Sequence, residues 1–336
     1  MAEQISDRHV DWRNNSASAT TLSNSSDTNE YLLRTTHLLR DDLPRSKELH
    51  ILENRNYPII RTDSPLFDAI YAMSINEVEE NAVEEVRDSS FSTEPCHCFE
   101  TGRKWSYVWT RDISYAAHLA LGGLNQGRTK NTLLFKISKR RNQSEDTVEI
   151  IQDTGNGGSW PLSTDRVVWA MAAWELLHHL EGQERSIFLQ TSYRAILNSI
   201  ENDLIAAFDP NDGLYTGEQS FLDWREQTYP RWVADNVVHI GMSKSLSTNV
   251  AHYMALKTLS LMALELRRAT DHQRYQKLAS ELAGKINTHF WDNEKGLYRT
   301  YLITYLDRAA VDKYDLLGNA LAVLSGVRQT EEQKNC

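Results

Sequence analysis

The sequence predicts an all-α fold built from paired helices, and two observations carry this prediction. Long segments show the apolar spacing of helices, whereas the alternation of apolar and polar residues that is typical of strands is sparse. In addition, a helix that is apolar on nearly every side is followed by a helix with one apolar face, and this pair occurs at 167–208 and again at 245–290. Repeated helical hairpins of this kind can close into a double-layered barrel with the apolar helices inside.

Apolar spacing and capping residues predict about eight helices in roughly four pairs. The first is expected from Pro65 to about residue 86, with Asp63 or Ser64 as its N-cap. The others are expected at about 112–121, 130–138, 167–180, 185–208, 245–268, 272–290 and 316–324. The last of these is an inner-type helix without an outer partner. Either the sequence is a fragment of a longer protein, or another chain covers this apolar face.

A short motif repeats at the ends of the two outer helices. Asp209-x-x-x-Gly213-Leu-Tyr recurs as Asp292-x-x-x-Gly296-Leu-Tyr, so the two copies are 83 residues apart (296 minus 213). Each copy follows an aromatic helix end. The motif therefore sets the register of a repeat that contains a loop, an inner helix and an outer helix.

The first 62 residues are predicted to be a polar and partly irregular segment, followed by the helical domain over residues 63–336. The stretch SASATTLSNSSDTN (16–29) is rich in Ser, Thr and Asn, which predicts a loop or disorder. Two further stretches, YLLRTTHLLR and ELHILENR, are equally compatible with short strands and with helical turns.

Composition excludes several classes of function. The net charge of −10 argues against a nucleic-acid partner, which needs a basic face. No run of about 18 apolar residues predicts a transmembrane helix. The start of the chain lacks the basic and apolar regions of a secretory signal, so a cytoplasmic location is the expectation. Three cysteines are too few for a disulfide framework, and Cys96-x-Cys98 is interpreted as two ordinary thiols. No metal constellation is present, and neither a metal nor an organic cofactor is expected.

The loop Tyr215–Trp232, with the sequence YTGEQSFLDWREQTYPRW, lies between an outer and an inner helix. It holds three carboxylates among aromatic and guanidinium groups. Aromatic faces stack on the apolar face of a sugar ring, and carboxylates hold hydroxyl groups or move protons. These residue types predict a sugar site. The alternative is a surface loop with incidental charge.

Four stretches in order resemble the six-hairpin (α/α)6-barrel glycosidases, a superfamily that includes glucoamylase, trehalase, the amylo-α-1,6-glucosidase part of glycogen-debranching enzyme, and α-L-rhamnosidase. They are WSYVWTRDISYAA (105–117), DTGNGGSWPLSTDRVVW (153–169), DGLYTGEQSFLDWREQTYPRW (212–232) and KYDLLGNALAVLSG (313–326). The resemblance implies an incomplete (α/α)6 toroid with about eight of twelve helices. It also implies an oligosaccharide or glycoside substrate and exo-type hydrolysis with inversion. The nearest branch is the debranching-type α-glucosidases.

The resemblance also implies roles for individual residues. Asp223 is the first choice for the general acid and Glu226 the second, although the Gly-Trp that precedes the acid in trehalases is Phe221-Leu222 here. The general base is expected on a later hairpin, beyond Cys336. The candidate substrate-binding residues are Trp109, Arg111, Asp112, Trp160, Asp165, Glu218, Trp224 and Arg231. Asn249, on an inner helix, is a further candidate, because a buried amide needs hydrogen-bond partners and can face a ligand.

Each of these assignments has a structural alternative. The two aspartates at helix starts also suit the positive end of a helix dipole, and the tryptophans also suit wall packing. At the level of the whole chain, the main alternative is a carbohydrate-binding or catalytically inactive barrel fragment that lacks the general base. A helical-repeat interaction module is a third possibility, but it leaves the W-x-R-D motif at 109–112 unexplained.

Overall fold

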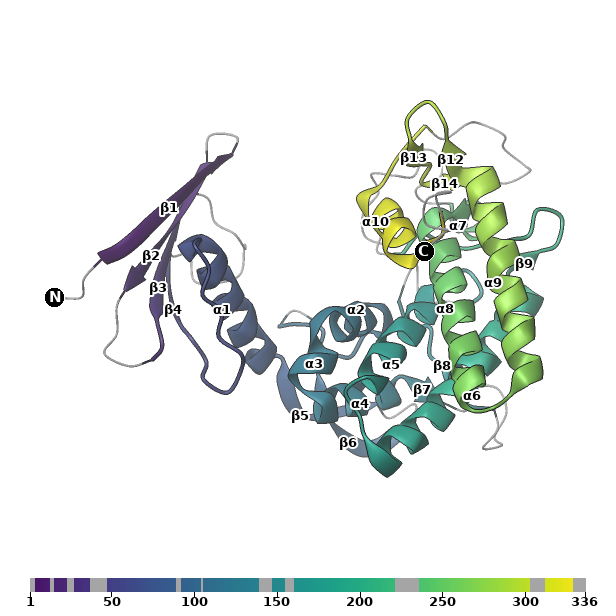
Figure 1. The fold of residues 1–336 in the computed structure, drawn as a ribbon, viewed down its shortest axis with the longest axis horizontal. Coiled ribbons are helices and arrows are strands. Elements are labelled where there is room, and N and C mark those ends of the chain that lie inside the picture. The colour runs from purple at the N-terminus through teal and green to yellow at the C-terminus, as the bar shows by residue number, and fades with distance from the viewer. Residues whose placement is uncertain are drawn as a thin grey trace. The chain divides into compact units, whose positions relative to one another are not determined.

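A computed structural model describes residues 4–12, 15–22, 27–36, 47–88, 92–103, 105–138, 147–154, 160–220, 236–302 and 312–328. The chain divides into two compact units, residues 1–83 and residues 84–336 (Figure 1). None of the helices that the structure describes is long and apolar enough to cross a membrane.

The first unit is a four-stranded antiparallel sheet with one helix on it (Figure 1). The strands follow the order β1 (Gln4–Trp12), β2 (Asn15–Leu22), β3 (Glu30–Thr35) and β4 (Glu48–Leu52). Helix α1 (Pro65–Glu80) begins after Ser64, whose side chain accepts a hydrogen bond from the Phe67 backbone N–H, as the capping prediction requires. The core of the unit consists of Ala19, Tyr31, Leu33, Ile51, Ala69 and Ala72.

Two expectations for this part of the chain differ from the structure. Residues 16–22 belong to strand β2, where a loop or disorder was expected, because Ala19 packs in the core shared with α1 and the neighbouring threonines favour extended backbone. The unit ends after Val83, where a boundary at residue 62 was expected, because α1 packs on the sheet. Of the two undecided stretches, residues 31–35 belong to β3 and residues 48–52 form β4.

The second unit is predominantly helical. Helices of the inner type are α2 (Thr110–Ala116), α5 (Trp169–Leu177), α8 (Leu246–Glu265) and α10 (Leu316–Ser325). Helices of the outer type are α4 (Gln126–Phe135), α6 (Gly182–Ala206) and α9 (Ala269–Phe290). Shorter helices are α3 (Gly122–Leu124) and α7 (Val237–Met242). In Figure 1, α8 and α9 run side by side. The predicted helices are confirmed, with ends that differ by a few residues.

Short strands connect these helices. The paired strands are β5 (Ala82–Asp88) with β6 (Ser92–Phe99), β7 (Ile137–Ser138) with β8 (Glu149–Ile150), β9 (Phe208–Asp209) with β10 (Leu214–Tyr215), β11 (Lys244–Ser245) with β14 (Tyr301–Leu302), and β12 (Trp291–Asp292) with β13 (Leu297–Tyr298). Cys96 and Cys98 on β6 have adjacent sulfur atoms, where the sequence interpretation expected two ordinary thiols. Residues two apart on a strand face the same side, which brings the two sulfurs together.

The repeated motif builds two equivalent hairpins, each between an outer and an inner helix. We call α6, β9–β10 and α8 the first module, and α9, β12–β13 and α10 the second module. Both hairpins turn at a glycine with positive φ, +75° at Gly213 and +66° at Gly296, where a side chain would be strained.

An asparagine of each of the inner helices α8 and α10 holds its hairpin by two hydrogen bonds to a tyrosine backbone. We call this contact the asparagine pin. Asn249 Oδ1 accepts from the Tyr215 N–H at 2.8 Å, and its Nδ2 donates to the Tyr215 carbonyl at 2.9 Å. Asn319 makes the same two bonds to Tyr298, at 2.9 and 3.0 Å. Equivalent residues are therefore 83 apart in the outer helices and hairpins, and 70 apart in the inner helices (319 minus 249).

Candidate active site

The N-terminal ends of three inner helices meet at a buried ion pair. Arg111 lies in the first turn of α2, and Asp165 lies in the 3₁₀ turn Asp165–Val168 that leads into α5. Arg111 Nη1 is 3.3 Å from Asp165 Oδ2, and both side chains are only 3% exposed. Ser220, whose backbone N–H donates to the Ser247 hydroxyl in the first turn of α8 at 3.0 Å, donates its own hydroxyl to the same carboxylate oxygen at 3.1 Å.

The Asp165 carboxylate is held on both oxygens. Gln152 Nε2 donates to Oδ1 at 2.9 Å, while Arg111 and Ser220 face Oδ2. Gln152 is fully buried, and its Oε1 accepts from the backbone N–H of Arg166 at 2.9 Å. A buried charge is tolerated when it is paired and hydrogen-bonded in this way. The arrangement therefore fixes the position of Asp165.

Tyr115 and Asp315 extend this polar cluster toward α10. Burial raises the pKa of the Tyr115 phenol, and the charge of Asp165 adds to that increase. Asp315 caps α10, where its Oδ1 accepts from the Gly318 N–H at 2.6 Å. Burial also raises the pKa of Asp315 above the usual range of a carboxyl. The fourth inner helix thus begins close to the same cluster.

Glu218 joins the loop before α5 to the segment before α8. Its carboxylate accepts a hydrogen bond from the Ser163 hydroxyl, and its backbone N–H donates to the Leu162 carbonyl at 3.1 Å. Its own carbonyl accepts from the hydroxyls of Ser245 and Thr248 at the start of α8. These bonds hold the Glu218 backbone close to the loop that carries Asp165.

The predicted residues of the W-x-R-D motif lie around the start of α2. Trp109 is the residue before the helix, and its ring packs edge-on against Tyr107 at 5.2 Å between centroids. Asp112 is partly buried in the first turn, where its charge suits the helix dipole. The structure therefore brings Arg111, Asp165 and the segment with Glu218 together, with Trp109 and Asp112 on the same helix end.

Two other predicted binding residues make contacts that account for their positions. Asn249 is fully buried, and in addition to its two bonds to Tyr215 its Nδ2 donates to the Ser245 carbonyl at 2.9 Å. The Trp160 indole N–H donates to Asp203 Oδ1 at 2.6 Å. These contacts give both residues a positioning role, and we leave Asn249 out of the proposed binding set.

The remaining predicted residues lie outside the part of the chain that the structure describes. They are Asp223, Trp224, Glu226 and Arg231, all within residues 221–235. Their roles stay predictions.

The sequence interpretation did not single out several buried residues around the cluster: Gln152, Arg166, Asp203, Ser220 and His252. One of them carried a usable signal. Asp203 lies seven residues after Ile196 and three after Ile200, on the apolar face of α6, where a carboxylate is unexpected without a partner. The partners of Gln152 and Ser220 come from distant segments, so no local pattern indicates them.

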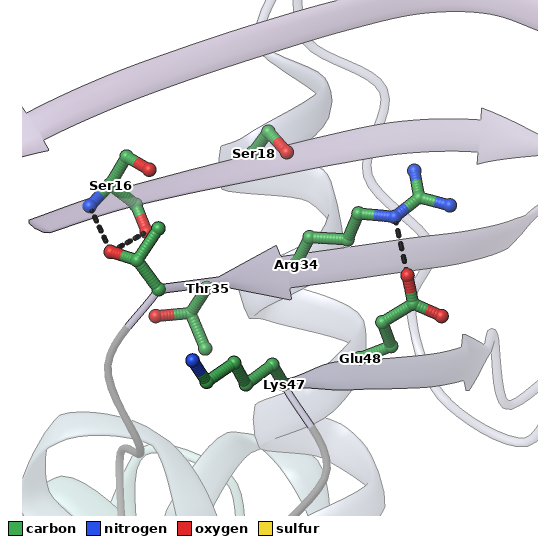
Figure 2. Close-up of a pocket in the computed structure, with 7 residues that line it drawn as sticks. Ser16, Ser18, Arg34, Thr35, Lys47 and Glu48 are labelled. Carbon is green, nitrogen blue, oxygen red and sulfur yellow. Dashed lines mark hydrogen bonds and ion pairs between the residues drawn. The ribbon is translucent and has the colours of Figure 1, made fainter.

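A shallow hollow on the sheet of the first unit is a poor candidate for the active site. Figure 2 shows Ser16, Ser18, Arg34 and Glu48 at one end of the sheet, with Arg34 Nε 2.7 Å from Glu48 Oε1. Both charged side chains are about half exposed, at 48% and 54%. Exposed pairs of this kind contribute little to binding or stability. Within the described residues, no group of three or more His, Cys, Asp and Glu side chains could hold a metal ion.

Comparison with known proteins places most of the chain in one family model. Residues 71–335 match the model described as the bacterial alpha-L-rhamnosidase 6 hairpin glycosidase domain. A search of the curated proteins found no match.

Solved structures show the same fold at low sequence identity. The GH78 family rhamnosidase of Bacillus sp. GL1 is 13% identical with a TM-score of 0.56, over 98% of this chain and 37% of that one. The rhamnosidase from Klebsiella oxytoca with rhamnose bound is 12% identical with a TM-score of 0.54, over 91% and 51% of the two chains. The α-L-rhamnosidase from Aspergillus terreus is 15% identical with a TM-score of 0.51, over 90% and 32%. The chain thus spans about half or less of their length, and the predicted fold of helical hairpins is confirmed.

Proposed function

Because the chain belongs to the family of the bacterial alpha-L-rhamnosidase six-hairpin glycosidase domain, we propose that it is the helical domain of a glycoside hydrolase that releases a terminal L-rhamnose. The family match favours a rhamnosidase over the debranching-type α-glucosidase that the loop motifs suggested. The observation that carries the proposal is the buried ion pair of Arg111 and Asp165 where the inner helices begin.

The ion pair is suited to holding sugar hydroxyls. A hydroxyl group both donates and accepts, so a fixed guanidinium beside a fixed carboxylate can bind adjacent hydroxyls in one orientation. Asp165 already faces three donors, which suits it to accept a further hydrogen bond from a sugar hydroxyl. We therefore assign Arg111 and Asp165 to substrate binding, with Asp112, Trp109 and Glu218 as neighbours.

We assign the general acid, which protonates the leaving oxygen, to the segment that follows Ser220. Inversion needs two carboxyls about 6.5–9.5 Å apart, one of which protonates the leaving oxygen. Asp223 is the first candidate for this acid and Glu226 the second, with Trp224 and Arg231 as nearby candidates for sugar contacts. Asp223 is only three residues after Ser220 in the sequence, and three extended residues span at most about 11 Å. The acid therefore lies within reach of the bound sugar in this proposal.

The test is hydrolysis of methyl glycosides by the full-length protein, because the departure of methanol depends on the proton from the general acid, and the general base is expected beyond Cys336. We expect turnover of the α-L-rhamnoside and none of the α-D-glucoside, with the inverted anomer as the first product seen by NMR. Asp223→Asn should lower kcat by about 10²–10⁴-fold if it removes the general acid, and Glu226→Gln should lower it less.

Other outcomes separate the rival functions. Turnover of the glucoside alone would restore the debranching-type assignment. Saturable binding of L-rhamnose without turnover, unchanged in Asp223→Asn, would identify a carbohydrate-binding or inactive barrel fragment. If the chain neither binds nor cleaves the sugar, both proposals are wrong.

A further inference from the structure

A second buried polar cluster lies next to the proposed binding residues. Asp203, in the last turn of α6, is fully buried, and its Oδ1 accepts from Arg166 Nη2 at 2.9 Å and from the Trp160 indole at 2.6 Å. His252 Nε2, on α8, lies 3.3 Å from Asp203 Oδ2. We call these four residues the Asp203 cluster. It ties the loop before α5 to an outer and an inner helix.

The Asp203 cluster is connected to Asp165 through Arg166. Arg166 is the next residue in the chain, so its guanidinium and the Asp165 carboxylate project from adjacent backbone positions. The Arg166 N–H donates to Gln152, and Gln152 in turn donates to Asp165 Oδ1. The position of Asp165 therefore depends on where Arg166 is held, and Asp203 holds it.

The Asp203 cluster is connected to Glu218 through His252 and Thr248. His252 Nδ1 lies 2.8 Å from the Thr248 carbonyl oxygen, one turn earlier on α8. The Thr248 hydroxyl donates to the Glu218 carbonyl. One buried carboxylate thus connects to both segments that form the proposed sugar site, on opposite sides.

The fold of a helical hairpin does not require these charges. In the second module, Ile286 stands 83 residues after Asp203 and Ala322 stands 70 residues after His252. Both are buried, with 0% and 2% exposure, and the hairpin between them keeps the same asparagine pin. Removing charged groups from water is unfavourable, and apolar residues of similar volume often replace a buried ion pair without loss of stability.

We propose that the Asp203 cluster is a positioning device that sets Asp165 and Glu218 for sugar binding, rather than a support of the fold. This inference rests on the proposed function. Asp203, Arg166 and His252 are positioning residues in this scheme, because they act on the site through Gln152, Asp165 and Thr248.

The test replaces the charged groups by apolar side chains of similar volume, with the second-module residue at position 203. The triple variant Arg166→Met/Asp203→Ile/His252→Leu removes all three charged or titratable groups together. We expect a melting temperature close to that of the wild type, while the affinity for L-rhamnose in titration calorimetry falls roughly 10- to 100-fold, because a displaced Asp165 loses its hydrogen bonds to the sugar hydroxyls. The control Ile286→Val alters the second module and should leave the affinity unchanged.

Each outcome decides the inference. If the triple variant binds L-rhamnose as tightly as the wild type, the cluster does not position the site. If the triple variant fails to fold, His252→Ala and His252→Gln decide it on p-nitrophenyl α-L-rhamnoside. A raised KM with little change in kcat in the alanine variant, restored in part by glutamine, supports positioning, because lost ground-state contacts act on KM. An unchanged KM in both contradicts it.

A wild-type chain that neither binds nor cleaves the sugar refutes the proposed function itself, and the positioning role falls with it.

Discussion

The first and second modules share one hairpin design and differ in what fills the space beside it. Both turn at a glycine with positive φ and pin a tyrosine backbone to an inner-helix asparagine. Both also join the end of the hairpin to the next segment through one backbone bond of 2.8 Å, from Gly217 to Ser243 and from Thr300 to Lys313. The backbone scheme is therefore independent of the side chains packed against it.

The side chains diverge where the inner helix meets the outer one. The first module buries Asp203 and His252, and burial would raise the pKa of Asp203, but the Arg166 charge and the His252 bond outweigh it and hold that pKa below its usual range. The second module has Ile286 and Ala322 at these positions. The hairpin forms with either set, so the hairpin alone does not require the charged set. Under the proposed function, this contrast assigns the charges of the first module to support of the neighbouring binding residues and leaves the second module as scaffold.

The largest effect should come from placing a buried acid in the second module. Ile286→Asp places a carboxylate at the counterpart of Asp203. Ala322 stands at the counterpart of His252, so the new charge lacks the histidine partner that Asp203 has. An uncompensated buried charge costs about 3–5 kcal/mol of unfolding free energy. Urea unfolding measures this, with Ile286→Val as a control that should cost about 0.5–1.5 kcal/mol.

The outcome bears directly on the comparison between the modules. If Ile286→Asp were no more costly than Ile286→Val, the second module would tolerate a buried acid as it stands. The presence of Asp203 in the first module would then need no functional explanation.

The fold was predictable where one short stretch decides it. Apolar spacing located the helices of the second unit, and the Asp-x-x-x-Gly-Leu-Tyr motif gave the register of the two modules, because turn glycines and helix faces are local properties. Strand β2 was missed for the opposite reason. Its small Ala, Ser and Thr residues carry little apolar signal, and contact with α1 decides their conformation.

The site was predictable only in part, since it depends on contacts between distant segments. Arg111 and Asp165 were each singled out by a motif, but 54 residues separate them and nothing local shows that they pair. Asn249 was expected to face a ligand because a buried amide needs partners, yet the backbone of its own hairpin supplies them. A comparison with Asn319 could have shown this, because an asparagine at the same place in the second module indicates a shared structural role.

The asparagine pins should give an intermediate effect that differs between the modules. Alanine at either position leaves a tyrosine N–H and carbonyl without their partner, which costs about 1–3 kcal/mol when the groups stay away from water. Asn249 is fully buried, whereas Asn319 is partly exposed, so water can replace some of its bonds. We expect Asn249→Ala to be the more destabilising variant in urea unfolding. An equal or reversed order would show that the two pins are not graded by burial.

The smallest effect concerns the aspartate that opens each hairpin, and it depends on pH. The Tyr314 hydroxyl, which donates to Asp292 at 2.7 Å, together with the N–H groups of Lys295 and Glu294, lowers the pKa of Asp292 from 3.8 to about 2. A carboxyl with a depressed folded-state pKa stabilises the fold fully above its unfolded value, and this contribution is lost as pH falls from about 4 toward 2. Asp292→Asn should therefore lower the melting temperature slightly at pH 6, and the gap to the wild type should narrow as the pH falls toward 2. In the first module Lys244 lowers the pKa of Asp209 instead, so Asp209→Asn should show a gap that closes in the same direction. A gap that stays constant between pH 6 and pH 2 would mean that neither aspartate stabilises its hairpin through its charge.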